Sequence, residues 1–138
     1  MDQSPIERIL SAVDRLDVDG AVATLTDDCR MMLVDGQRVA GRDHVRTVLA
    51  DFFGGLRSTS HKVISEWHEG DTWIAEMEAS YELRNWLLVE RVPRAMFLRH
   101  TSDGVSDIRF YGAHERSIID RGGDPDAMRI GGRWIPPL

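Results

Sequence analysis

Two side chains that can move protons are predicted to lie on apolar strand faces. His61 falls on the same side of a predicted strand, residues 58–68, as Val63 and Trp67. An imidazole titrates near neutral pH, so in an apolar cavity it can orient or activate a carbonyl or hydroxyl group. A lone histidine on such a face is more often a core residue with its hydrogen bonds satisfied, and the sequence leaves both interpretations open.

Tyr81 and His114 are the other candidates for acid/base chemistry. Tyr81 lies on the apolar face of a predicted strand, residues 73–83, and a buried phenol needs a hydrogen-bond partner, either a ligand or a backbone carbonyl. His114 lies near the end of the last predicted strand and shares its alternation with Ile108 and Phe110. It is either a proton donor or acceptor at the mouth of a site or a solvated residue beyond the rim.

No metal, cofactor or cysteine chemistry is expected. The five histidines are not spaced as metal ligands, since none has another four residues away. Gly54 and Gly55 end a predicted helix instead of opening one, so they form no phosphate-binding loop. The single cysteine, Cys29, shares strand parity with Met31 and is predicted to be a small buried hydrophobic residue.

Three helices and one strand are predicted in the first part of the chain. Ser4, Pro5 and Glu7 form a helix start with a capping box, and apolar residues then recur at helical spacing up to residue 13. Residues 16–20 break that helix and cap a second, short one. A strand over 29–34 and a third helix over 42–53 follow.

Four antiparallel strands are predicted after the helices, over residues 58–68, 73–83, 87–99 and 105–115. The second has the cleanest alternation, because one face is apolar and the other carries Glu76, Glu78 and Glu82. Pro93 marks a bulge or an edge in the third. Helices followed by an antiparallel sheet indicate an α+β fold with the helices on one face.

Length and composition indicate one globular domain, residues 1–138. The net charge is −6 and no basic stripe is visible, so nucleic acid is not expected as a partner. No apolar run approaches the roughly 20 residues that span a bilayer, and a single cysteine favours a reducing compartment. We therefore expect a cytoplasmic protein with no membrane partner. The tail, residues 120–138, carries Trp134 and Ile135 and is predicted to dock on the domain, with a flap over a pocket or an arm to a second subunit as alternatives.

The order of several short motifs resembles the nuclear transport factor 2-like superfamily, in its SnoaL-like and ketosteroid-isomerase-like branch. The resemblance covers residues 5–116. It rests on Arg8, the joint at 16–20, Leu25, Asp27-Asp28, Gly41-Arg42-Asp43, the turn at 69–72 and the segment 103–112. It implies a cone-shaped, curved antiparallel sheet wrapped by three N-terminal helices, with a pocket at the open end.

The usual catalytic acids of that branch are absent from the matching positions. Where the resemblance implies a tyrosine and two aspartates for steroid isomerisation, this chain has Ile9, Leu33 and Ala95. The aspartate implied for SnoaL-like cyclases is replaced in the run Tyr111-Gly112-Ala113, and residues 87–99 lack the aspartate of the epoxide hydrolase pattern. Function must therefore be argued from the site.

The resemblance also implies a pocket for a small apolar or aromatic molecule and a homodimer through the outer sheet face. On that face Arg91, Arg94 or Arg99 would offset the glutamates of the neighbouring strand. The residues expected to line the pocket are Ile9, Leu33, Phe53, Trp67, Ala95, Phe97, Ile108 and Phe110.

Three hypotheses follow. The first is a SnoaL-like domain that binds a small apolar molecule. The second is a cyclase, isomerase or hydrolase that uses His61, Tyr81 or His114 as acid or base without a cofactor. The third is a dimerisation or interaction module with a closed pocket. A cavity of roughly 300 Å³ or more would favour the first two, and an enzyme needs polar side chains inside that cavity.

Overall fold

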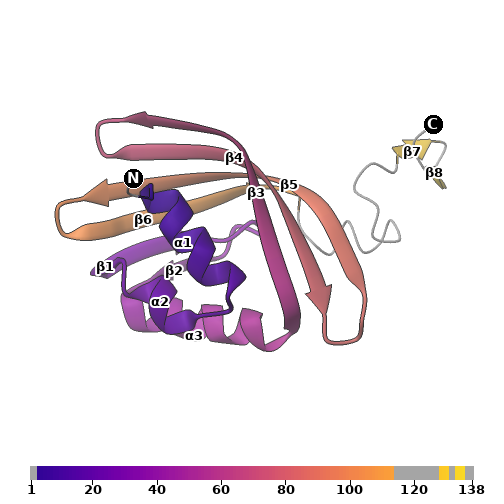
Figure 1. Ribbon diagram of the computed structural model, residues 1–138, viewed down its shortest axis with the longest axis horizontal. Helices are drawn as coiled ribbons and strands as arrows, with labels where there is room; N and C mark the ends of the chain where they lie inside the picture. Colours follow the sequence, from indigo (N-terminus) through magenta and orange to yellow (C-terminus); the bar gives the residue numbers. More distant parts are fainter. Residues whose placement is uncertain (1–2, 114–127, 131–132, 136–138) are drawn as a thin grey trace.

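The computed structural model describes residues 3–113, 128–130 and 133–135. Within them a curved six-stranded sheet is covered on one face by three helices (Figure 1). The helices are α1 (Pro5–Asp14), α2 (Val18–Val22) and α3 (Arg42–Gly54). The sheet contains β1 (Leu25–Met32), β2 (Arg38–Ala40), β3 (Leu56–Glu69), β4 (Thr72–Leu83), β5 (Leu88–Thr101) and β6 (Gly104–Gly112). Two short strands in the tail, β7 (Met128–Ile130) and β8 (Arg133–Ile135), pair with each other.

The sheet order is β2-β1-β6-β5-β4-β3, and the α+β cone predicted from the sequence is confirmed. Strands β3 to β6 form the expected antiparallel succession. The sheet is mixed, however, because β1 runs parallel to β6. Local alternation could not reveal this pairing, since it joins strands that are far apart in the sequence. The short strand β2, which pairs with the end of β1, was not predicted.

The helix starts follow from the local sequence. Ser4 Oγ accepts a hydrogen bond from Glu7 N at 3.1 Å and the Glu7 carboxylate accepts from Ser4 N, which completes the capping box. Asp17 caps α2 by accepting from Gly20 N at 2.9 Å. These caps satisfy free backbone amides and so stabilise the starts of α1 and α2.

Two bulges decide which side chains face the helices. In β3 the register shifts after Val63, so that Trp67 pairs with Ile74 on the outer face. In β5 the residues 90 and 91 stand opposite Ser80 alone, and Arg91 has a positive φ of 53°. Each extra residue reverses the alternation of the strand beyond it. Pro93, predicted to mark a bulge or an edge, follows two residues after the second bulge.

The inner face of the sheet holds the core. Met77 and Met96 from the sheet pack there with Ile6 and Leu10 of α1 and Val45 of α3. Within the described residues, no helix is both long and apolar enough to cross a membrane. The predicted homodimer, docked tail and cytoplasmic location stay predictions.

Gly112 fixes the close approach of β6 to β5. Its φ is +134°, and a Cβ at this position would lie 2.3 Å from the Pro93 carbonyl oxygen. Gly112→Ala should therefore lower the free energy of unfolding by at least about 2 kcal/mol, measured by urea denaturation. Gly54→Ala is the control, because nothing lies within 4 Å of the added methyl group and the change should be neutral or stabilising. Equal midpoints for Gly112→Ala and the wild type would contradict the assigned backbone.

Candidate functional site

A cavity of about 260 Å³ lies between the inner face of the sheet and the helices α1 and α3. Most of its wall is apolar. Four residues with polar groups also line it, His61 on β3, Tyr81 on β4, Arg94 on β5 and Asp35 in the turn after β1. Such a wall suits a small ligand that is mainly apolar and carries one or two oxygen atoms.

His61 is held by Asp14, the last residue of α1. The imidazole Nδ1 lies 2.6 Å from Asp14 Oδ1, and the backbone N of His61 donates to the other carboxylate oxygen at 3.2 Å. The His61 side chain is 5% exposed and that of Asp14 is 30% exposed. Because a carboxylate accepts, Nδ1 is the donor of this hydrogen bond, and Nε2 is the ring nitrogen left for a ligand.

Tyr81 is held by Arg94 from the neighbouring strand. Arg94 Nη1 donates to the phenolic oxygen at 2.5 Å, and Nη2 donates to the backbone oxygen of Ala113 at 3.2 Å. Both residues are buried. A phenol that accepts from a guanidinium becomes a better donor through its own proton, because the positive charge draws electron density from the oxygen.

The two pairs lie next to each other on the inner face. The rings of His61 and Tyr81 meet edge to face with centroids 6.3 Å apart, and Phe52 of α3 packs against the other side of Tyr81 at 5.7 Å. A base and a polarised hydroxyl group therefore face one apolar space, which is the arrangement needed to remove a proton next to a carbonyl group.

Asp35 lies in the turn between β1 and β2. Its Oδ1 accepts from the backbone N of Gln37 at 2.9 Å, so the carboxylate holds the turn as well as lining the cavity. It does not stand at any of the three positions where the resemblance implied a catalytic acid.

Six of the predicted site residues are brought together by the fold. His61 and Tyr81 line the cavity with Ile9 of α1, Leu33 after β1, Phe53 of α3 and Phe110 of β6. Whether they contact a ligand stays a prediction.

The other predicted residues lie elsewhere. Ile108 is buried in the core and is not part of the cavity wall. Trp67, Ala95 and Phe97 are on the outer face, and Trp67 is 53% exposed. The bulge in β3 turns Trp67 outward, and the bulge in β5 does the same to Ala95 and Phe97. His114 lies outside the described residues.

Three polar residues of the site were not predicted. Arg94 was expected on the outer face, yet the bulge at residues 90–91 turns it inward. Asp14 was passed over because it ends a helix and pairs with a residue 47 positions away. Asp35 follows the predicted strand 29–34 and was not considered as a site residue. For Asp14, the available signal was its position four residues after Leu10, at the end of the apolar stripe of the first helix.

The family comparison agrees with this architecture. The model of the SnoaL-like domain matches residues 6–114. This chain belongs to the SnoaL-like domain family. No curated protein matches it at a significant level.

Solved structures share the SnoaL-like fold at low sequence identity. A hypothetical protein with a ketosteroid isomerase-like fold from Catenulispora acidiphila, solved with trimethylamine, superposes with a TM-score of 0.77 at 13% identity over 91% of this chain and 98% of its own. A putative SnoaL-like polyketide cyclase from Shewanella denitrificans has a TM-score of 0.73 and 8% identity, covering 84% of this chain and 92% of its own. An LEH-like epoxide hydrolase from M. tuberculosis has a TM-score of 0.70 and 20% identity, covering 79% of this chain and 80% of its own. Identities this low establish the fold alone.

Cys29 provides a check on the burial of the inner face. Its side chain is 1% exposed, and burial raises the pKa of the Cys29 thiol, with a further increase from the neighbouring Asp28 carboxylate. We expect a disulfide reagent at pH 8 to label the native SnoaL-like domain roughly 100-fold more slowly than the urea-unfolded chain.

The same shift predicts a pH effect on stability. A pKa raised by folding gives a contribution that is complete below the pKa of the unfolded thiol and is lost as the pH rises through the folded value. The wild type should therefore lose more stability than Cys29→Ala on going to alkaline pH. Fast labelling of the native chain would contradict the buried position.

Proposed function

We propose that this SnoaL-like domain is a cofactor-independent acid/base enzyme that moves a proton next to the carbonyl group of a small, mostly apolar compound. The observation that carries the proposal is the Asp14–His61 pair at 2.6 Å beside the Tyr81–Arg94 pair at 2.5 Å, both at one apolar cavity. Isomerisation and intramolecular aldol closure are the reaction classes that this chemistry serves.

His61 acts as the base. Its Nε2 removes a proton from the carbon next to the carbonyl group, and the ring becomes an imidazolium. Asp14 stabilises that positive charge and keeps the ring in the orientation and tautomer needed for the transfer. The same nitrogen then returns the proton to another atom of the substrate.

Tyr81 serves the substrate oxygen. As the proton leaves carbon, negative charge grows on the carbonyl oxygen, and a hydrogen bond from a phenol polarised by Arg94 stabilises it more in the transition state than in the ground state. The apolar wall excludes water, which would otherwise weaken this interaction.

The size of the cavity limits the ligand. At about 260 Å³ it is slightly below the roughly 300 Å³ at the lower end of drug-sized sites. Since most of the wall is hydrocarbon and phenylalanine, affinity comes from apolar burial and orientation from the polar pairs. The hypothesis of a closed interaction module is less well supported, because polar side chains reach this cavity.

The first test needs no knowledge of the natural substrate. Acetophenone and 2-cyclohexen-1-one incubated with the protein in D₂O should exchange the hydrogens next to the carbonyl group, followed by proton NMR. His61→Gln should lower the exchange rate by about 100-fold, and Tyr81→Phe by about tenfold or more. Exchange that is equal in the wild type and in His61→Gln would overturn the proposal.

A second test separates orientation by Asp14 from stability. Asp14→Asn keeps the shape of the side chain but removes the negative charge that orients His61, so the exchange rate should fall by about tenfold. Asp51→Asn, an exposed carboxylate on α3, is the matched control and should leave the exchange rate unchanged. A lowered thermal midpoint of Asp14→Asn in circular dichroism would show that the slower exchange comes from lost stability and not from lost orientation of His61.

Binding can be tested apart from chemistry. Leu49→Trp places a larger side chain in the cavity wall and should abolish binding of acetophenone in native mass spectrometry. Leu88→Trp, at a residue 52% exposed outside the cavity, is the control. Binding that survives Leu49→Trp would place the ligand elsewhere.

A further inference from the structure

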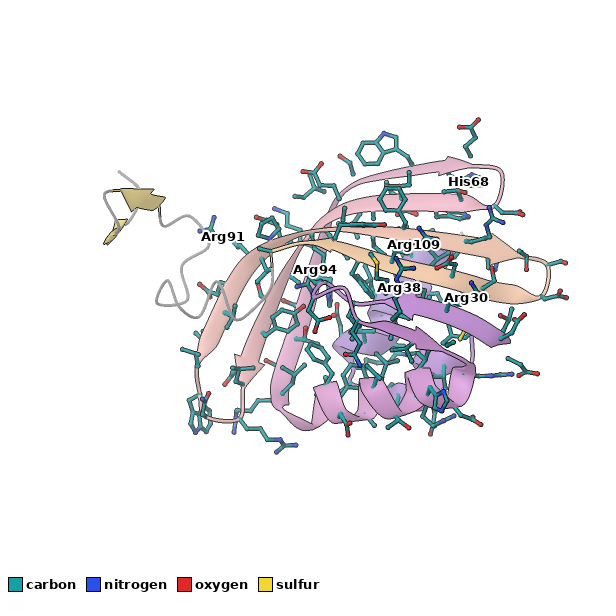
Figure 2. The ribbon with its side chains drawn as sticks, turned by 180° about the vertical axis from the view of Figure 1, so that it is seen from behind. Arg30, Arg38, His68, Arg91, Arg94 and Arg109 are labelled. Carbon is teal, nitrogen blue, oxygen red and sulfur yellow. The ribbon has the colours of Figure 1, made fainter. Side chains whose placement is uncertain are left out.

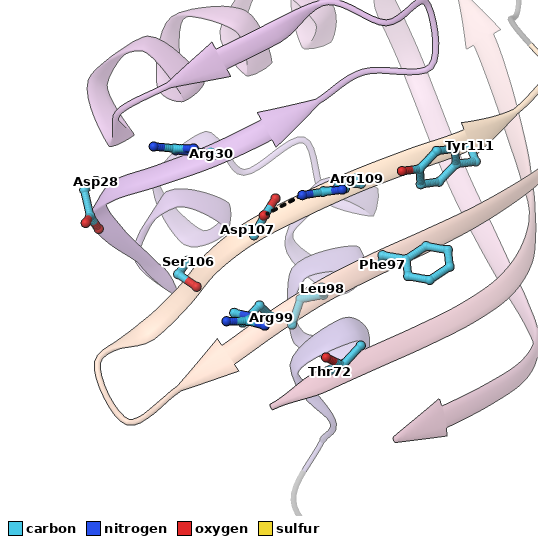
Figure 3. Close-up of a pocket in the computed structure, with 10 residues that line it drawn as sticks. All are labelled: Asp28, Arg30, Thr72, Phe97, Leu98, Arg99, Ser106, Asp107, Arg109 and Tyr111. Carbon is cyan, nitrogen blue, oxygen red and sulfur yellow. Dashed lines mark hydrogen bonds and ion pairs between the residues drawn. The ribbon is translucent and has the colours of Figure 1, made fainter. Parts of the chain in front are cut away.

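The outer face of the sheet carries a second hollow, a groove of about 620 Å³ over β1, β6, β5 and the start of β4. Figure 3 shows the side chains that line it, among them Arg30, Arg99 and Arg109 around Asp107. The register places these residues on the face opposite the core, because they alternate with inward residues such as Ile108. The groove is therefore separate from the inner cavity.

Positive charge is concentrated at this groove. Asp107 stands directly between Arg30 of β1 and Arg99 of β5 in the strand register. Arg109 lies two residues further along β6 and donates to Asp107 at 3.4 Å. The fourth cation, Arg38 of β2, is separated from Arg109 only by Met32 in the same row (Figure 2).

Among the residues that the structure describes, two carboxylates, Asp107 and Asp28, line the same hollows as these four arginines. A positive surplus therefore remains on a chain whose net charge is −6. Hydrogen bonds of the Arg109 side chain with Tyr111 and, to a smaller extent, with Asp107 raise the pKa of Arg109, and these contacts orient its guanidinium. A fixed guanidinium binds an oxyanion with less loss of side-chain entropy than a free one.

An aromatic pair adjoins the charges. Phe97 and Tyr111 meet edge to face with ring centroids 5.5 Å apart, and they are 38% and 42% exposed. Phe97 stands opposite Arg109 in the register of β5 and β6. A planar ring can therefore pack on these side chains while a group attached to it reaches the guanidinium.

We infer that the outer groove is a second binding site, for a small aromatic molecule that carries a carboxylate or phosphate group. The oxyanion is bound by Arg109 and Arg99, with the hydroxyl groups of Thr72 and Ser106 within the same groove. The ring lies against Phe97 and Tyr111. This inference is independent of the chemistry proposed for the inner cavity.

A second copy of the chain would find less to complement on this face. Two of the three outward glutamates of β4 have a basic neighbour in the same sheet, whereas Glu76 stands opposite Ser65 and Ala95. Lys62 stands opposite Glu78, and Arg57 forms an ion pair with Glu82 at 3.2 Å. The excess positive charge at the four arginines therefore favours an anionic ligand from outside the sheet. Self-association of the chain is an outcome of the test.

The test is titration calorimetry with phenyl phosphate, inorganic phosphate and benzyl alcohol. Phenyl phosphate should bind best, because only it supplies both the ring and the charge, and its affinity should fall as salt is added. Arg109→Gln and Arg99→Gln should each weaken it by about tenfold or more. Arg57→Gln is the matched control, since this arginine is similarly exposed and ion-paired but lies at the other end of the face.

Each outcome bears on the inference. Loss of affinity in both groove variants with an unchanged control, in chains whose thermal midpoints are unaltered, supports it. Affinity that is lost in Leu49→Trp but kept in the groove variants would move the ligand to the inner cavity and overturn it. No binding at roughly 1 mM would also overturn it, as would a dimer in light scattering that dissociates in Arg109→Gln.

Discussion

Three polar side chains, His61, Tyr81 and Arg94, lie within an apolar interior, and the rest of the site depends on the hydrogen bonds that they make. Removing a histidine, a tyrosine and an arginine from water costs several kcal/mol unless each finds a partner. Asp14 meets this need for His61, and Arg94 and Tyr81 meet it for each other. Each pair also joins separate parts of the chain, since Asp14 ties α1 to β3 and Arg94 ties β5 to β4. Stability and chemistry therefore depend on the same contacts.

The curvature of the sheet makes room for these pairs. Bulges in β3 and β5 bend these strands, and α1 and α3 lie on one face of the curved sheet (Figure 1). The space that remains between the sheet and the helices is the inner cavity, and the groove at the arginines lies on the opposite surface.

Local features of the fold could be predicted from the sequence because their causes are local. The capping box at Ser4 and Glu7 and the alternation of β4 depend on neighbours in the chain. The parallel pairing of β1 with β6 and the contact of Asp14 with His61 depend on residues brought together only by folding. Alternation also failed beyond the bulges, because Trp67 and Phe97 follow an extra residue that no single-sequence pattern marks. Pro93 pointed to irregularity in β5 but not to its position, so Arg94 was assigned to the wrong face.

The alternation of β5 beyond its bulge has a consequence for how such a chain can vary. Arg94 and Met96 face inward, whereas Ala95 and Phe97 face outward on the opposite side of the same strand. Losing or gaining one amino acid after Pro93 would exchange these two sets at once, pushing Phe97 into the interior and carrying Arg94 out to solvent. Insertions and deletions in related chains should therefore occur in the hairpin loops. Within the strand, variation should occur by substitution, and residues of one face can change without altering the other face.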